Sequence, residues 1–372
     1  MSGSIFKEVT FTPYAFEKNF NFKNRRRWPK LISILESLID SGIIIAVSSD
    51  WKDQVSSFMN DYNEEDKEEI EALLKEIDSR NRISFYPNHD QYDEEETWIA
   101  KIKSLNETRA FDFIATTQNT NLLHTVENIE RRTYKNTGAR VERQTYNNMK
   151  KMLAPVLSYA EIVKIIDPYF NLSEERFEDV LTMICNSLGD NHGKKNDSII
   201  EVHTSIKSML NNERPREFVW QKANRWVHIL KEHEKKYGHE IILYIWEEIR
   251  NQNQWHDRWL ITNQCGISIG SGADISDWTD STWGLLDWEE LPVISNKFNS
   301  NRKIYNFIGK INSTTIIKNQ NPENTSTYMT EEEQALESER VEKKAKLAEQ
   351  ERLEKINRTP KKLRPSTLKR VR

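Results

Sequence analysis

The sequence is poor in cysteine and in long apolar runs. Only two of its 372 residues are cysteines, Cys185 and Cys265, and two thiols cannot form a disulfide framework for a chain of this length. We therefore expect a reducing, cytoplasmic compartment. The N-terminal segment has no positively charged stretch followed by an apolar one, so no secretory signal is expected. The longest apolar runs of the whole chain, such as 43–47, are far shorter than the roughly 18 residues that span a membrane, which predicts no transmembrane segment.

The chain also has little net charge and no pattern of metal ligands. A formal net charge of −4 excludes a polycation, so any attraction to nucleic acid or anionic phospholipid must come from local patches. The histidines are scattered. His228 and His233, for example, are five residues apart and do not share a helix face. We therefore predict neither a metal nor another cofactor.

The first 120 residues alternate between strand-like and helix-like patterns. The strand-like runs are 42–49, 81–87 and 111–117, and the apolar residues of 31–40 and 64–78 recur at the helical period. This alternation predicts a small N-terminal α/β domain over 1–120. No chemical motif indicates its role.

A polar, basic segment follows at 121–153. It contains many Lys and Arg residues, with Tyr134 and Tyr146 between them. One interpretation is a connector or an exposed helix. The other is a strip that contacts phosphate, since basic side chains neutralise a nucleic-acid backbone and tyrosine can stack on bases.

The segment 154–318 reads as strands linked by helices. The expected order is strand 161–170, helix 174–188, strand 197–205, helix 216–238, strand 240–246, and a hairpin formed by 256–262 and 267–272. Helical crossovers between strands predict a mixed sheet. Asp167, His203 and Glu247 lie at or just past the ends of the first three strands, where ligands of open α/β sheets gather. Each also has a structural interpretation, as a turn residue, a buried strand-end histidine and a solvent-facing carboxylate.

The last segment, 319–372, is dominated by charge. Its middle part combines Glu and Lys at helical spacing, which predicts a solvated helix able to dock a protein partner. Its end, 357–372, has seven basic residues and no acidic one, which predicts disorder and a patch for nucleic acid or acidic lipid.

One motif carries chemistry. His256 is followed by Arg258, then after four residues by Asn263, and after six more by Gly270 and Ser271. This spacing resembles the H-x-K-x4-D-x6-G-S motif of the phospholipase D superfamily, with Arg in place of Lys and Asn in place of Asp. The resemblance covers about fifteen residues and includes the predicted hairpin.

The resemblance implies a phosphodiesterase site. It assigns catalytic roles to His256 as nucleophile, to Arg258 as the cation that neutralises phosphate oxygens, and to Ser271 as a hydrogen-bond donor. Asn263 and Gly270 would support them, together with the strand-end residues named above. The family needs two motifs, and only one is found. A homodimer would have to supply the second histidine.

The two substitutions favour binding over turnover. Arg258 keeps the positive charge and can contact a phosphate through two N–H groups. Asn263 removes the carboxylate that would orient or balance a histidine.

A second resemblance covers about 160 residues in two anchors. The segments 165–181 and 255–278 are similar to the phospholipase-D-like C-terminal domain of MIT-domain proteins, which carries a D-P-Y segment, an H-D-R strand and a G-x-G-x-D-I ending. It implies the same sheet used to bind phospholipid without hydrolysis. The N-terminal block shows no resemblance to the MIT module.

The predicted fold class is therefore α/β. A phospholipase-D-like mixed sheet flanked by helices is preceded by a smaller α/β domain and followed by a charged helical and disordered tail. Our first hypothesis is a metal-independent, dimeric nuclease of phosphodiesterase type that serves antiviral defence. The second is a catalytically inactive module that binds phospholipid or nucleic-acid phosphate, and the third is a structural subunit of a larger complex.

Overall fold

The structure is a computed structural model. It describes residues 5–17, 27–86, 94–108, 110–135, 139–141, 144–188, 198–210, 217–249, 255–275, 280–299, 301 and 304–319. The tail predicted for 319–372 lies outside the described residues apart from Asn319. The described chain is a mixed α/β protein with two sheets flanked by helices, as predicted.

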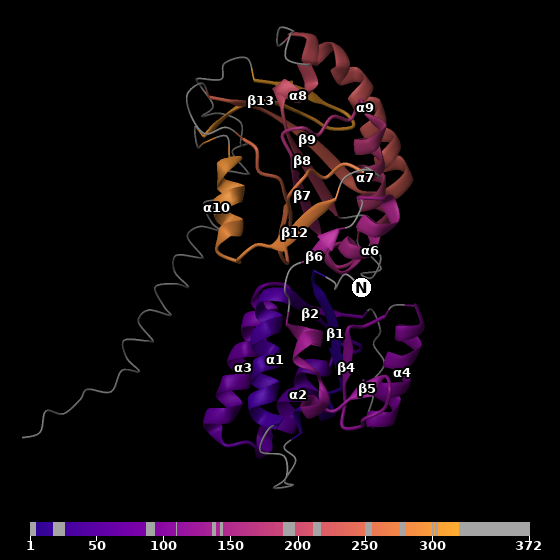
Figure 1. The fold of residues 1–372 in the computed structure, drawn as a ribbon, viewed down its shortest axis with the longest axis vertical. Helices are drawn as coiled ribbons and strands as arrows, with labels where there is room; N and C mark the ends of the chain where they lie inside the picture. The colour runs from indigo at the N-terminus through magenta and orange to yellow at the C-terminus, as the bar shows by residue number, and fades with distance from the viewer. Residues whose placement is uncertain are drawn as a thin grey trace, which may run out of the picture. The chain divides into compact units, whose positions relative to one another are not determined.

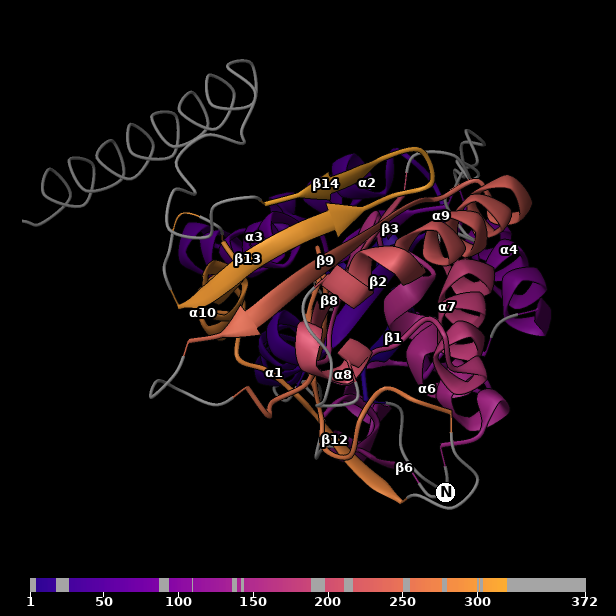
Figure 2. The same cartoon turned by 90° about the horizontal axis from the view of Figure 1, so that it is seen from above.

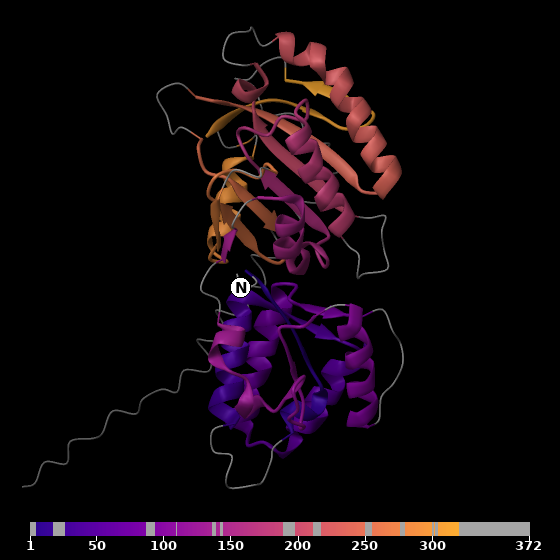
Figure 3. The same cartoon turned by 45° about the vertical axis from the view of Figure 1, so that its right-hand side comes forward.

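The first sheet is parallel throughout and is flanked by helices on both sides (Figures 1 and 3). Its strands follow the spatial order β3 (Ile83–Phe85), β2 (Gly42–Ala46), β1 (Lys7–Phe11), β4 (Phe113–Ala115) and β5 (Leu123–His124). Its helices are η1 (Pro13–Phe16), α1 (Arg27–Ser41), α2 (Trp51–Phe58), η3 (Met59–Asp61), α3 (Glu64–Ser79), α4 (Glu95–Thr108), η4 (Val126–Asn128) and α5 (Arg131–Tyr134). This strand order is that of a doubly wound sheet.

The second sheet is mixed. Its strands follow the order β14 (Ile316–Lys318), β13 (Tyr305–Ile311), β9 (Glu240–Glu248), β8 (Ile199–Ser205), β7 (Ile162–Ile166), β10 (Trp259–Thr262), β11 (Gly266–Ile269), β12 (Ser281–Leu285) and β6 (Ala139–Val141). Strands β7, β8 and β9 are parallel, and the other pairings are antiparallel. The predicted crossovers and the β10–β11 hairpin are confirmed.

Helices cover both faces of the second sheet. They are α6 (Tyr146–Leu157), α7 (Glu175–Ser187), α8 (Ile206–Leu210), α9 (Glu217–Tyr237) and α10 (Glu290–Lys297). Helices α6, α7 and α9 lie on one face and α10 on the other (Figure 2). Alternation along β8 explains the two faces, since Ile200 and Val202 pack toward the first group while His203 packs against Phe298, which directly follows α10.

The segment predicted as a basic connector contributes to both sheets. Within 121–153 the structure places β5 at the edge of the first sheet and β6 at the edge of the second. Helix α6 begins here too, where the Thr145 side chain accepts the Asn148 backbone N–H. The segment is therefore built into the fold rather than being a linker.

The two sheets belong to one compact unit, residues 1–322, and share buried side chains. Phe6 and Ile43 of the first sheet belong to the same apolar cluster as Val163 and Ile267 of the second. Arg82 Nε donates to the Gln264 carbonyl at 2.8 Å across this boundary. Burial of the apolar contacts stabilises the arrangement by about 25 cal/mol per Å².

A glycine in β13 marks a close approach between two backbone segments. A Cβ on Gly309 would lie 2.3 Å from the Ile317 carbonyl oxygen and 2.6 Å from the ring of Trp220. We expect Gly309→Ala to lower the free energy of unfolding by about 1–3 kcal/mol, because strand β14 would have to move. Urea unfolding followed by tryptophan fluorescence measures this loss of stability. Gly284→Ala is the matched control, since a Cβ there meets nothing within 4 Å. Equal losses of stability in Gly309→Ala and Gly284→Ala would contradict the close backbone approach at Gly309.

Candidate phosphate-binding site

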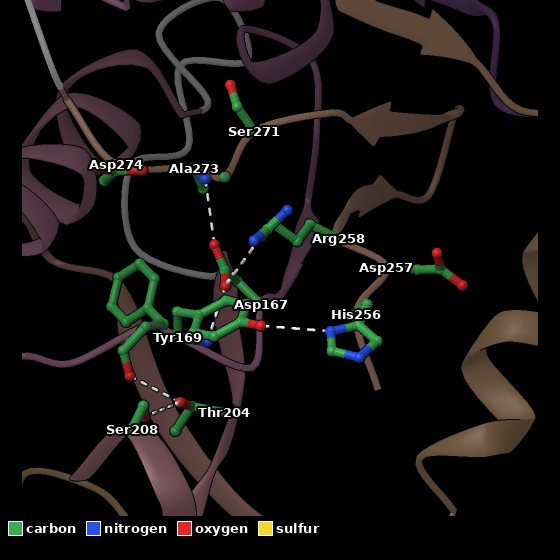
Figure 4. A network of polar contacts seen from close by, with 12 residues as sticks. Asp167, Tyr169, Thr204, Ser208, His256, Asp257, Arg258, Ser271, Ala273 and Asp274 are labelled. Carbon is green, nitrogen blue, oxygen red and sulfur yellow. Dashed lines mark hydrogen bonds and ion pairs between the residues drawn. The ribbon is translucent and has the colours of Figure 1, made fainter. Parts of the chain in front are cut away.

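A buried carboxylate lies at the end of β7. Asp167 is 1% exposed, and its two oxygens accept the backbone N–H groups of Tyr169 at 2.8 Å and Ala273 at 3.1 Å (Figure 4). Burial raises the pKa of Asp167, whereas the two N–H groups and the nearby Arg258 act to lower it. Asp167 thus links the end of β7 to the segment that follows β11.

Arg258 is held beside Asp167 by three contacts. Its Nε lies 3.7 Å from Asp167 Oδ1, its Nη1 donates to the Gly270 carbonyl at 2.9 Å, and its guanidinium carbon lies 4.7 Å from the centre of the Tyr169 ring. The Nε is buried and makes no hydrogen bond with any described residue, so its interaction with Asp167 is purely ionic. The guanidinium is therefore fixed in position before any ligand arrives.

His256 lies at the exposed side of the same cluster. Its Nδ1 is 3.3 Å from the hydroxyl of Tyr169, a ring that is 43% exposed (Figure 4). The predicted strand over 256–262 begins only at Trp259, so His256 and Arg258 precede β10. Local bonds explain the late start, because the Trp255 backbone N–H donates to Glu248 and its indole to the Asp257 carbonyl. Tyr169, rather than strand alternation, brings His256 and Arg258 together.

Ser271 does not join the other two predicted catalytic residues. Its Oγ donates to Gln144 Oε1 at 3.2 Å, and the side chain points away from His256 (Figure 4). The Gln144 amide donates in turn to the Gly272 carbonyl at 2.6 Å. Gly270 contributes its carbonyl to Arg258, and a Cβ on Gly270 would meet the Thr282 carbonyl oxygen at 2.9 Å. The Gly-Ser pair therefore shapes the loop that holds Arg258.

Asn263 lies at the opposite end of β10 from His256. Its side chain accepts the Glu161 backbone N–H at 3.1 Å, and its carbonyl accepts from Asn81 at 3.2 Å. Both contacts stabilise the β10–β11 turn. Asn263 therefore has a structural role at the turn and does not orient His256.

His203 is part of a buried aromatic and polar cluster. It lies within β8 at 4% exposure, its Nδ1 accepts the Trp246 indole N–H at 3.1 Å, and its ring stacks on Tyr244. Burial lowers the pKa of His203, against the influence of Glu201, whose Oε2 is 3.6 Å from Nε2. Burial favours the uncharged ring, and its contacts are those of a packing residue, as in the structural interpretation.

Glu248, rather than Glu247, borders the site. Glu247 lies within β9 opposite Asn306 of β13. Glu248 accepts from Lys207 and from the Trp255 N–H. Burial alone would raise the pKa of Glu248, but Lys207, Trp255 and, more weakly, His256 outweigh it and keep it below its usual range. Sequence reasoning missed Lys207 and Gln144, because neither belongs to a local motif.

The resulting site is a set of hydrogen-bond donors without a metal centre. Arg258, the Tyr169 hydroxyl and the His256 ring lie on one exposed surface, backed by the buried Asp167. Among the described residues, no group of three or more His, Cys, Asp or Glu side chains is arranged to hold a metal ion. Such a set can bind the oxygens of a phosphate group. None of the helices in the described ranges is long and apolar enough to cross a membrane.

Comparisons with known proteins give only distant likenesses. No protein-family profile matches the chain, and no curated protein matches it. The chain is similar to the solved structure of TrmBL2, described as an archaeal chromatin protein with a novel mode of DNA binding, at 12% identity over 68% of this chain and 69% of that chain, with a TM-score of 0.24.

Two further solved structures are similar to the chain. The first is Drosophila Piwi (7% identity, 78% of this chain, 43% of that chain, TM-score 0.17). The second is Aa-Ago with externally bound siRNA (13% identity, 79% of this chain, 43% of that chain, TM-score 0.15). The chain thus spans less than half the length of either. At TM-scores below 0.5, none of the three likenesses carries an argument about fold or function.

The Glu201 carboxylate next to His203 gives a prediction about acid stability. Burial alone would raise the pKa of Glu201, but His203 and Lys164 outweigh it and lower the pKa to about 2. The Lys164 ammonium lies 2.7 Å from Glu201 Oε2 and carries a permanent positive charge at pH 7. A carboxyl with a depressed folded-state pKa stabilises the fold above its unfolded pKa, and this contribution is lost as the pH falls toward 2.

We expect Glu201→Gln to lower the free energy of unfolding by about 1–3 kcal/mol at pH 7. The difference from wild type should shrink between about pH 4.5 and pH 2, measured by urea unfolding at each pH. Glu240→Gln, at an exposed position of β9, is the control and should change little. A difference for Glu201→Gln that stays constant with pH would argue against the ion pair.

Proposed function

We propose that this chain is a phospholipase-D-like module that binds the phosphate backbone of nucleic acid and does not hydrolyse it as a single chain. The observation that carries the proposal is the placement of Arg258. Its guanidinium is fixed by Asp167, the Gly270 carbonyl and the Tyr169 ring, beside the exposed His256. A cation fixed in this way loses little conformational entropy when a phosphate binds.

Binding fits the site better than turnover. The superfamily resemblance implies two histidines for hydrolysis, and the motif supplies only His256. Ser271 is bonded to Gln144, and Asn263 lies at the far end of β10, so neither supports the chemistry that the resemblance assigns to it. What remains beside His256 is a phosphate-binding cation and an aromatic hydroxyl.

Nucleic acid is favoured over anionic phospholipid by the exposed aromatic ring. Tyr169 is 43% exposed beside the cation, and base stacking on an aromatic side chain contributes about 1–3 kcal/mol. Nucleic acid offers both a phosphate for the Arg258 cation and a base for the Tyr169 ring, because each nucleotide carries the two groups.

A second candidate function is a dimeric, metal-independent nuclease in antiviral defence. It is favoured by the exposure of His256, because an exposed ring is accessible to the same residue of a second chain. The structural-subunit hypothesis depends on residues outside the described ranges. Comparing the oligomer size with and without residues 323–372 tests it.

Binding of a fluorescein-labelled single-stranded DNA 20-mer, followed by anisotropy with a chelator present, tests the proposal. We expect Arg258→Ala and His256→Ala each to weaken binding by about tenfold, because each removes a phosphate contact. Arg225→Ala on α9 removes an exposed arginine elsewhere and should change the affinity less than about twofold. Because Arg258→Ala also leaves Asp167 without its cation, the thermal midpoint is recorded for every variant.

Three outcomes would overturn the proposal. The first is DNA affinity that is equal in wild type and both site variants. The second is binding to phosphatidylserine vesicles but not to DNA, which would identify a lipid module. The third is cleavage of the DNA by wild type but not by His256→Ala, which would establish the nuclease instead.

A further inference from the structure

A polar cavity lies away from the His256 site, where the two sheets meet. It has a volume of about 340 Å³ and is lined by residues of α1, by the segment between α3 and β3, and by β12 with the turn that follows it. This volume is within the range of about 300–1,000 Å³ that is usual for small-molecule sites. No part of the His256 site contributes to its wall.

A buried cation faces this cavity. Arg82 is 2% exposed, and its contacts are to the carbonyl oxygens of Leu38, Ile39 and Gln264. Among the described residues, no carboxylate lies within ion-pair distance of it. Burial lowers the pKa of Arg82 to about 10, so the guanidinium is still charged at pH 7. The Asp40 carboxylate acts to raise the pKa of Arg82 but does not outweigh the burial. Burying a charge is costly, and an anion in the cavity would offset the remaining cost.

Two further cations and an aromatic ring line the same cavity. The guanidinium carbons of Arg80 and Arg82 lie 5.3 Å and 5.7 Å from the centre of the Trp288 ring. Lys135 is exposed; its backbone N–H donates to the Arg131 carbonyl, whereas its ammonium group forms no hydrogen bond or ion pair with a described residue. Its ammonium is therefore available to a ligand. Arg80 is already ion-paired with Glu76 at 2.9 Å and with Asp40 at 3.4 Å, so Arg82 and Lys135 supply most of the positive charge for a phosphate. The indole ring adds a surface for a flat ring.

The wall also carries acceptors and open space. Asp40, whose Oδ1 lies 3.4 Å from Arg80 Nη1, and Asp287 line the cavity and are exposed, so their carboxylates can accept hydrogen bonds from hydroxyl or amino groups. A Cβ on Gly284 would meet no atom within 4 Å, so the backbone of β12 is open to the cavity. The lining thus combines cations with acceptors, which suits a ligand with both an anionic group and hydroxyl groups.

We propose that this cavity binds a nucleoside monophosphate. The phosphate would be bound by Lys135 and the two arginines. The ribose hydroxyls or base amino groups would donate to Asp40 and Asp287, with the base near Trp288. Helix α1 packs beside β2 of the first sheet, and β12 is a strand of the second sheet. A nucleotide bound between them would therefore stabilise the boundary between the two parts.

Isothermal titration calorimetry with AMP tests the proposal, with adenosine and inorganic phosphate as partial probes. We expect AMP to bind with a dissociation constant below about 1 mM and at least tenfold more tightly than either partial probe. Lys135→Glu and Gly284→Phe should each weaken AMP binding by about tenfold or more, the first by reversing a charge and the second by filling the cavity.

Matched controls separate this cavity from the rest of the molecule. Lys75→Glu reverses the charge of an exposed lysine on α3 that does not line the cavity, and His256→Ala alters the proposed nucleic-acid site. Both should bind AMP like wild type. Gly284→Ala, with its thermal midpoint, shows whether a side chain at this strand position is tolerated.

Four results would overturn the inference. The first is the absence of AMP binding, by calorimetry and by thermal shift, at about 5 mM. The second is equal affinity for AMP and inorganic phosphate, which would indicate an anion site only. The third is AMP binding that Lys135→Glu and Gly284→Phe leave unchanged, which would place the nucleotide elsewhere. The fourth is loss of AMP binding in His256→Ala, because the two sites would then be one.

Discussion

The site depends on one buried interaction, the contact of the Asp167 carboxylate with two backbone N–H groups and one guanidinium. Through Tyr169 it fixes the turn after β7, and through Arg258 and Ala273 it joins β7 to the two segments that flank the β10–β11 hairpin. A carboxylate at 1% exposure is stable only when its oxygens are satisfied, so the surrounding loops have little freedom to move. Removing this charge would leave Arg258 with only the Gly270 carbonyl and the Tyr169 ring.

A comparison of the two arginines clarifies what each cluster can do. Arg258 is 20% exposed, has a carboxylate partner, and lies over the exposed Tyr169 ring. Arg82 is buried, donates to carbonyl oxygens, lies near the Trp288 ring and faces a cavity. The first arrangement is a fixed cation at a surface, suited to a long phosphate backbone. The second is a buried charge beside a confined space, suited to a small anion.

Local sequence patterns predicted the α/β class and part of the elements, but not strands β1, β12, β13 and β14 or helices α4 and α10. The alternation of apolar strands and amphipathic helices predicted both sheets, and the turn at Asn263 predicted the hairpin, because both signals arise from neighbouring residues. Strand β6 was missed, since a three-residue edge strand has no pattern of its own and forms only by pairing with β12. The late start of β10 was missed because it depends on Trp255 bonding to Glu248, seven residues away.

The motif spacing located His256 and Arg258 but could not show what surrounds them. The bond between Ser271 and Gln144 joins residues 127 positions apart, and no local pattern records such a contact. The same holds for the cavity beside Arg82, whose walls come from two sheets. The sequence therefore led to the hypothesis of phosphate chemistry, while our proposal of binding rather than hydrolysis is drawn from tertiary contacts.

The most direct test of the central claim is a crystal structure of the protein soaked in tungstate, a heavy analogue of phosphate. The account predicts an anomalous peak within hydrogen-bond distance of the Arg258 guanidinium and beside the His256 ring. A structure with these side chains placed as described here, but with no tungstate between them under conditions that saturate other anion sites, would contradict it.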